Sequence, residues 1–121
     1  MIPPIYPLCL ASPPVLLAFG ATPTRVYPFG LIEGAPGWPY AVWQTVSGSP
    51  ENYLAQRPDV DALTTQVDVY AKNEESLIQA AKALRDAFEP RGYITRWGSQ
   101  MLDPETKLLR LSFDVDWLVP R

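Results

Sequence analysis

Apolar and polar residues alternate strictly near the end of the chain. Side chains on a β-strand point to opposite faces in turn, so this pattern predicts a strand over residues 107–119 with one buried and one wet face. The apolar positions are Leu109, Leu111, Phe113, Val115, Trp117 and Val119, and the polar positions between them are Arg110, Ser112, Asp114 and Asp116. Residues 62–71 alternate in the same way and predict a second long strand.

A helical period replaces the alternation after residue 73. Leu77, Ala81, Leu84 and Phe88 form a single apolar stripe. Asn73 is a suitable N-cap, and Pro90 and Gly92 end the helix. Residues 4–19 predict a short helix or a broken pair, with Ser12 as an N-cap and Leu16, Leu17 and Phe19 packed inward.

Three shorter strands are predicted at residues 24–29, 40–46 and 93–97. Ser47, Gly48, Ser49 and Pro50 predict a turn that opens a long excursion to Val60. Residues 98–105 are predicted to connect the last two strands. Loops of this length are usually functional or mobile, so the segments 47–61 and 98–105 are candidate contact regions.

The element order α-β-β-β-α-β-β indicates an α+β fold in a single domain over residues 1–121. Neighbouring strands with modest connections favour a mostly antiparallel sheet of about five strands, with one long and one short helix packed on its apolar face. A chain of 121 residues provides one core.

The composition argues against chemistry at this domain. The chain has no His and one Cys, so the serines near residue 48 lack a catalytic base, and Cys9 is expected to be a buried small hydrophobe. Neither the carboxylates nor the glycines follow the spacing of a metal or phosphate site. We therefore predict no catalytic, metal or cofactor residues, and a protein that is not an enzyme.

Charge and hydropathy restrict the partners. The net charge is −3 and the pI is near 4.8, which argues against tight binding to a nucleic-acid backbone but allows a surface past which DNA slides. The sequence shows no segment that we expect to cross a membrane and no signal peptide.

Two groups of residues allow both a structural and an interaction role. Trp38, Tyr40, Trp43 and Tyr53 either anchor the core and loops or form an interface, where aromatic residues are enriched. Asp114 and Asp116 share one strand face, which is either a solvated surface or an acidic surface facing a pore or a basic partner.

The chain resembles the tail-completion, or tail-terminator, proteins of long-tailed bacteriophages and prophages. The resemblance covers residue 20 to the end and depends on the order and spacing of several short motifs. These are residues 25–28 (RVYP), 39–44 (PYAVWQ), 66–71 (QVDVYA), 83–87 (ALRDA), 103–106 (DPET), Arg110 and 112–115 (SFDV).

The resemblance implies a structural virion protein that forms a hexameric ring at the head-proximal end of the tail tube. Such a ring caps the growing tube of the major tail tube protein and presents a docking surface to head-completion proteins in the neck. DNA passes through the centre without specific binding. The implied location is the virion, after assembly in the host cytoplasm.

These implications assign candidate roles to exposed positions. We hypothesise that Asp114 and Asp116 line the lumen and repel DNA. The candidates for partner contacts are Trp38, Tyr40, Trp43, Glu51, Asn52, Tyr53, Arg57, Asp59, Gln100 and Asp103. Two alternatives remain open, namely a head–tail joining protein that does not set tail length and a small binding module outside any virion.

Overall fold

The computed structural model describes residues 2–21, 23–28, 32, 36–50 and 59–121. Three helices and five strands form its regular structure. In chain order they are α1 (Ile5–Leu10), α2 (Pro13–Phe19), β1 (Val26–Pro28), β2 (Tyr40–Pro50), β3 (Val60–Ala71), α3 (Glu74–Phe88), β4 (Gly92–Leu102) and β5 (Leu109–Pro120).

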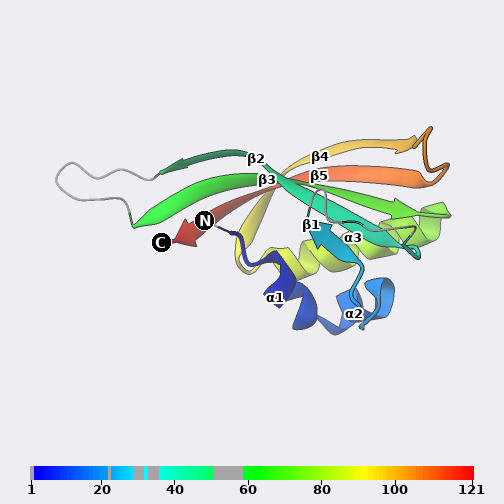
Figure 1. Cartoon of the computed structure of the whole chain (residues 1–121), viewed down its shortest axis with the longest axis horizontal. Coiled ribbons are helices and arrows are strands. Elements are labelled where there is room, and N and C mark those ends of the chain that lie inside the picture. The colour runs from blue at the N-terminus through cyan, green and yellow to red at the C-terminus, as the bar shows by residue number, and fades with distance from the viewer. Residues whose placement is uncertain (1, 22, 29–31, 33–35, 51–58) are drawn as a thin grey trace.

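The strands form one sheet with the order β1-β2-β3-β5-β4. The pairs β2–β3, β3–β5 and β4–β5 are antiparallel, whereas β1 pairs parallel to β2. The expected α+β class and mostly antiparallel sheet are confirmed. The helices lie together on one side of the sheet, and β2 and β3 extend past them as a long hairpin (Figure 1).

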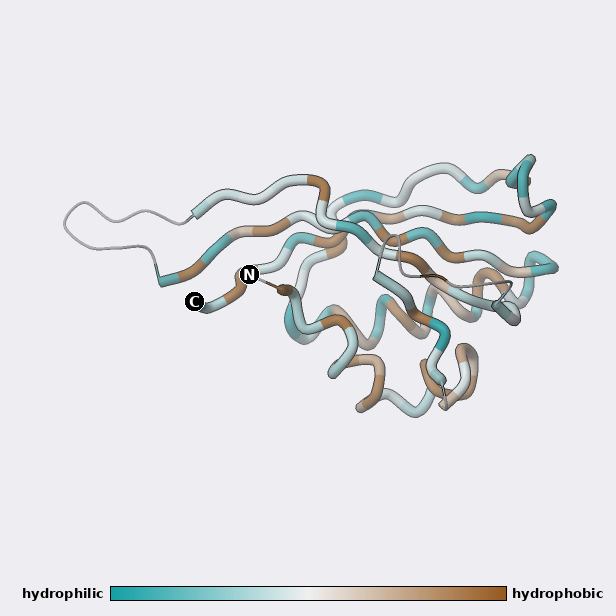
Figure 2. The backbone as a smooth tube through the Cα atoms, in the orientation of Figure 1, coloured by the Kyte–Doolittle hydropathy of each residue, from teal (hydrophilic) through white to brown (hydrophobic). Residues whose placement is uncertain are grey.

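The core lies between the sheet and the helices. Alternate residues of β3 and β5 enter it, as the pattern predicted, and apolar and polar positions alternate along these central strands in Figure 2. Trp117 is fully buried against Phe88 of α3, and its indole N–H donates to Thr65 Oγ1 at 3.0 Å. That bond satisfies the one polar atom of a large buried ring.

The N-terminal segment forms two helices, which is the broken pair of the two possibilities left open, so the described part of the chain has three helices where one long and one short helix were expected. Ser12 accepts a hydrogen bond from the Val15 amide at 3.4 Å, and Gly20 ends α2 with a φ of 91° that disfavours other residues. Phe19 is buried, but the inward position predicted for Leu17 is wrong because its side chain is 89% exposed. Leu17 lies about 200° around the helix from buried Val15.

Several predicted strand boundaries are wrong. The turn predicted at residues 47–50 is part of β2, because Ser47, Gly48, Ser49 and Pro50 pair with β3 after a bulge at Val46. Similarly, residues 98–102 continue β4 and pair with β5 after register shifts. β1 is shorter than predicted, and Phe29 lies outside the described residues.

The helical prediction for residues 74–88 is confirmed. The Asn73 side chain accepts from the Ser76 amide at 2.8 Å, and Glu74 and Glu75 occupy the first turn. Leu77, Ala81, Leu84 and Phe88 are all buried. None of the described helices has the length and apolar character needed to span a membrane.

Candidate functional site

The sheet surface turned away from the helices carries mostly polar side chains, and we call it the open face. On it, directly paired residues of neighbouring strands form rows that cross the sheet. Its members are Tyr40, Val42, Gln44 and Ser47 of β2, Thr64, Gln66, Asp68 and Tyr70 of β3, Arg110, Ser112, Asp114 and Asp116 of β5, and Tyr93, Arg96 and Met101 of β4.

Three aspartates in the middle of the open face are held by neighbouring strands. Thr64 Oγ1 donates to Asp116 Oδ1 at 2.7 Å, and Arg96 Nη1 lies 3.5 Å from Asp114 Oδ2. Asp68 accepts hydrogen bonds from Ser112 Oγ and Gln66 Nε2. The face therefore presents negative charge at fixed positions on a rigid sheet.

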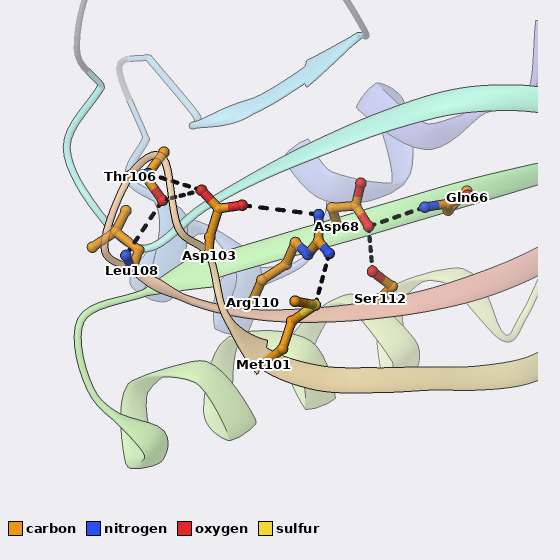
Figure 3. Close-up of polar contacts among 8 residues, drawn as sticks. All are labelled: Gln66, Asp68, Met101, Asp103, Thr106, Leu108, Arg110 and Ser112. Atoms are coloured by element: carbon orange, nitrogen blue, oxygen red, sulfur yellow. Dashed lines mark hydrogen bonds and ion pairs between the residues drawn. The ribbon is translucent and has the colours of Figure 1, made fainter.

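An aromatic and cationic row crosses the open face at one end. The rings of Tyr40 and Tyr70 stack with centroids 4.8 Å apart and an interplanar angle of 15°. Burial raises the pKa of both tyrosines, and the neighbouring Tyr70 hydroxyl raises the pKa of Arg110. Arg110 Nη2 also lies 3.0 Å from Met101 Sδ, so this guanidinium links β5 to β4 (Figure 3).

The turn between β4 and β5 is an ordered structure organised by Asp103. Its Oδ2 accepts from the Thr106 amide at 2.9 Å and from Thr106 Oγ1 at 2.7 Å, while Leu108 N donates to Thr106 Oγ1 (Figure 3). Arg110 Nη1 lies 4.0 Å from the other carboxylate oxygen. The turn is thus a preformed projection with little left to order on binding.

The Asp103 carboxylate gives the turn a dependence on pH. Hydrogen bonds from Thr106 hold the pKa of Asp103 below its ordinary value. A carboxyl with a lowered folded-state pKa stabilises the fold above its unfolded pKa, and this contribution is lost as the pH falls through the folded value. We therefore expect Asp103→Asn to be less stable than the parent protein at about pH 7, with a smaller difference near pH 3.

Urea unfolding of both proteins at the two pH values measures this difference. The neighbouring change Glu105→Gln is the control and is expected to alter stability by less than about 0.5 kcal/mol throughout. A difference between Asp103→Asn and the parent that is equal at both pH values would contradict the role given to this carboxylate.

The β2–β3 hairpin forms an arm at the opposite end of the sheet. Arg121 Nη2 lies 3.1 Å from Asp61 Oδ1, and the Arg121 amide donates to Asp59 O at 2.8 Å, so the residue that follows β5 supports the end of the arm. Gly48 faces Leu63, where a Cβ would lie 2.7 Å from Cδ2. Hollows of about 550 and 450 Å³ flank this part of β2.

The predicted contact residues are spread over the molecule. Trp38 is half exposed with Lys72 Nζ 4.9 Å from its ring centre, whereas Tyr40 is buried and Trp43 is half-buried against the core. Asp59 lies on the arm, and Gln100 and Asp103 lie at the other end of the sheet. Four further candidates fall outside the described residues, namely Glu51, Asn52, Tyr53 and Arg57.

The structure adds residues that sequence reasoning did not select. Asp68, Tyr70 and Arg110 organise the open face, and the alternation of β3 and β5 already placed them on its polar side. These residues could be recognised as site residues only from the strand pairing, which brings Tyr70 opposite Arg110 and Asp68 opposite Ser112.

The described residues contain no group of three or more His, Cys, Asp or Glu placed to hold a metal ion. Cys9 is buried, and this burial raises the pKa of its thiol to about 12, which keeps the sulfur protonated and unreactive at neutral pH.

Comparison with protein families gives a match to the model for "Tail completion protein gp17" over residues 3–120. The chain belongs to this tail completion family. It is therefore a structural phage protein of the tail and virion, which agrees with the resemblance seen in the sequence motifs.

Solved structures contain similar chains. One of them, in a structure of the virion of a native gene transfer agent particle, has a TM-score of 0.69 and 13% identity to this tail completion protein. The match covers 97% of this chain and 92% of that chain, so the two share a fold over nearly their whole lengths. The comparison with curated proteins gives no match.

Proposed function

We propose that this tail completion protein forms a ring that caps the head-proximal end of the tail tube. The ring, with six subunits, stops polymerisation of the major tail tube protein and provides the docking surface for head-completion proteins. DNA passes through its centre. The protein carries out this role in the virion after assembly in the host cytoplasm.

The observation that carries the proposal is the division of the sheet into three regions. A rigid polar face occupies the middle, an ordered turn at residues 103–108 projects at one end, and the β2–β3 arm projects at the other end. A tube cap needs one contact toward the tube and a different contact toward the head. The turn and the arm supply two different projections for these roles.

The open face is suited to line the channel of such a ring. Asp68, Asp114 and Asp116 are short carboxylates fixed by neighbouring strands, so they repel the phosphate backbone without reaching out to trap it. Arg96 and Arg110 bring positive charge to the same surface, but they form ion pairs with Asp114 and Asp103, respectively.

Interruption of the gene in its phage tests the proposal directly. Electron microscopy of the lysate is expected to show overlong or ragged tails beside unattached heads filled with DNA. Complementation with the intact gene on a plasmid is the control and should restore tails of uniform length. Tails of normal length joined to heads would contradict the proposal.

The same experiment distinguishes the capping role from the alternative role of a head–tail joining protein. A protein that joins finished tails to heads without setting tail length would leave tails that are normal in length but unattached. Both roles would use the open face, the turn at residues 103–108 and the arm. The length distribution of the tails therefore decides between capping and joining.

A further inference from the structure

The edge strand β4 carries an unusual share of the exposed apolar surface. Five of the eleven exposed large hydrophobic side chains among the described residues lie on β4 or beside it on β5. They are Tyr93, Trp97, Met101, Leu102 and Leu118, and we call them the β4 edge surface. Tyr93, Met101 and Leu118 lie on the margin of the open face, whereas Trp97 and Leu102 lie on the side of the sheet that the helices cover, so this surface wraps around the edge. Surface of this kind on one edge marks a contact site.

The area of the β4 edge surface is sufficient for the centre of a specific contact. Since a large side chain offers about 150–250 Å² and these five are 42–71% exposed, they present on the order of 500 Å² together. A stable interface buries about 800 Å² on each partner. A partner that contacts the edge strand from both sides of the sheet would thus cover most of one half of such an interface.

A second apolar surface lies on the N-terminal helices. The exposed side chains there are Ile2, Tyr6, Leu10 and Leu17, and we call them the helical surface. The first 24 residues contain no Asp, Glu, Lys or Arg, so no charge accompanies these side chains on their own segment. Leu17 is 89% exposed on this uncharged surface. Exposed apolar side chains are unfavourable in water, so the surface is suited to contact with another apolar surface.

Regular strand pairing along β4 is interrupted by two irregularities. The register with β5 shifts between Ile94 and Arg96 and again between Trp97 and Gln100. Such bulges twist an edge strand and discourage the addition of another strand. A partner of β4 therefore docks through side chains.

A hollow below the C-terminal end of β4 offers a place for such side chains. It has a volume of about 340 Å³ and is lined by Leu77, Met101, Leu102, Leu109, Gln100 and Glu74. Four of the six lining residues are apolar, so the hollow suits a leucine or tyrosine of the partner. The helical surface presents both of these residue types.

The two surfaces lie on different sides of the molecule. β4 is at one edge of the sheet, whereas α2 leads through the Arg25 N to Phe19 O hydrogen bond into β1 at the other edge. The charges from residue 91 to 102 are Arg91 and Arg96, and the helical segment brings no cation to oppose them. Contact between the two surfaces therefore brings no like charges together.

We propose that the β4 edge surface of one copy of the protein binds the helical surface of the next copy. A contact between two different surfaces repeats from subunit to subunit, and it closes into a ring when the rotation allows. The inference depends on the proposed ring for this closure and identifies the two surfaces that build it.

Two charge insertions test the contact. Leu17→Arg alters the helical surface and Tyr93→Arg alters the β4 edge surface, and both side chains are highly exposed, so the fold should persist. Sedimentation of the purified protein over rising concentration measures self-association. Each variant alone is expected to raise the dissociation constant at least about tenfold, because a charge replaces a central apolar contact. Lys82→Glu on the exposed side of α3 is the control.

Mixing the two variants gives the decisive result. Leu17→Arg retains an intact β4 edge surface and Tyr93→Arg retains an intact helical surface, so the mixture is expected to form a one-to-one dimer that cannot extend. A mixture that stays monomeric, variants that associate like the parent, or a parent that is monomeric at every concentration would each overturn the inference. Tail length in the gene-interruption experiment reports separately on the capping function.

Discussion

Replacement of residues 51–58 by Asn-Gly is expected to leave the sheet folded and to produce phage tails of uncontrolled length. Pro50 and Asp61 are paired at the end of the arm, so a short turn with Asn-Gly can join β2 to β3 without loss of a described strand pair. The replacement removes the candidate contact residues Glu51, Asn52, Tyr53 and Arg57. We expect capping to fail because the arm then lacks its contact with a neighbouring ring or subunit.

Electron microscopy of complemented lysates measures this effect, and circular dichroism confirms the fold. A variant in which Gly and Ser replace residues 51–58 at the original length separates reach from side-chain chemistry. Failure of both variants assigns the contact to the side chains, whereas failure of the short variant alone assigns it to length. Tails of uniform length with the Asn-Gly variant would show that the arm does not take part in capping.

Charge reversal on the open face is the second change with a large expected effect. Asp114→Lys combined with Asp116→Lys places two long cations where two short carboxylates are held by Arg96 and Thr64. If this face lines the channel, the lysines bind phosphates of the passing DNA. We expect slower DNA packaging or ejection from assembled particles, with the delay reduced at higher salt because exposed charges are screened.

The matched control places the same charge change on the helical side of the molecule. Asp86 and Glu89 lie near the end of α3 with side chains that are 65% and 53% exposed. Their change to Lys is expected to leave the rate of DNA release unaltered. If the open-face variant and the parent assemble to the same extent and release DNA at equal rates, Asp114 and Asp116 do not line the channel.

The central fold could be predicted from the sequence because its signals are strong and local. Strict alternation in β3 and β5 and the apolar stripe of α3 each have one physical explanation, namely burial of one face. The ends of β2 and β4 could not be predicted in the same way. Residues 47–50 have the composition of a turn, and residues 98–102 do not alternate, yet both segments are held by hydrogen bonds to a neighbouring strand.

The candidate site was predictable in part. The polar side of the open face, including Asp114 and Asp116, followed from alternation, but the partners Thr64 and Arg96 depend on strand pairing that the sequence does not specify. Trp43 illustrates the opposite case, because the identity of an aromatic residue does not reveal its face. Pairing with Val67 places Trp43 on the side that packs against the core.

The cross-strand bonds of the open face have a consequence for folding accuracy. Alternation excludes a slip of β5 against β3 by one residue, which would turn apolar side chains to water, but it tolerates a slip by two. Thr64 with Asp116 and Asp68 with Ser112 are each hydrogen-bonded to the residue directly opposite. A slip by two residues would break both bonds at once, so the polar side of the sheet selects the correct alignment that the apolar core alone leaves ambiguous.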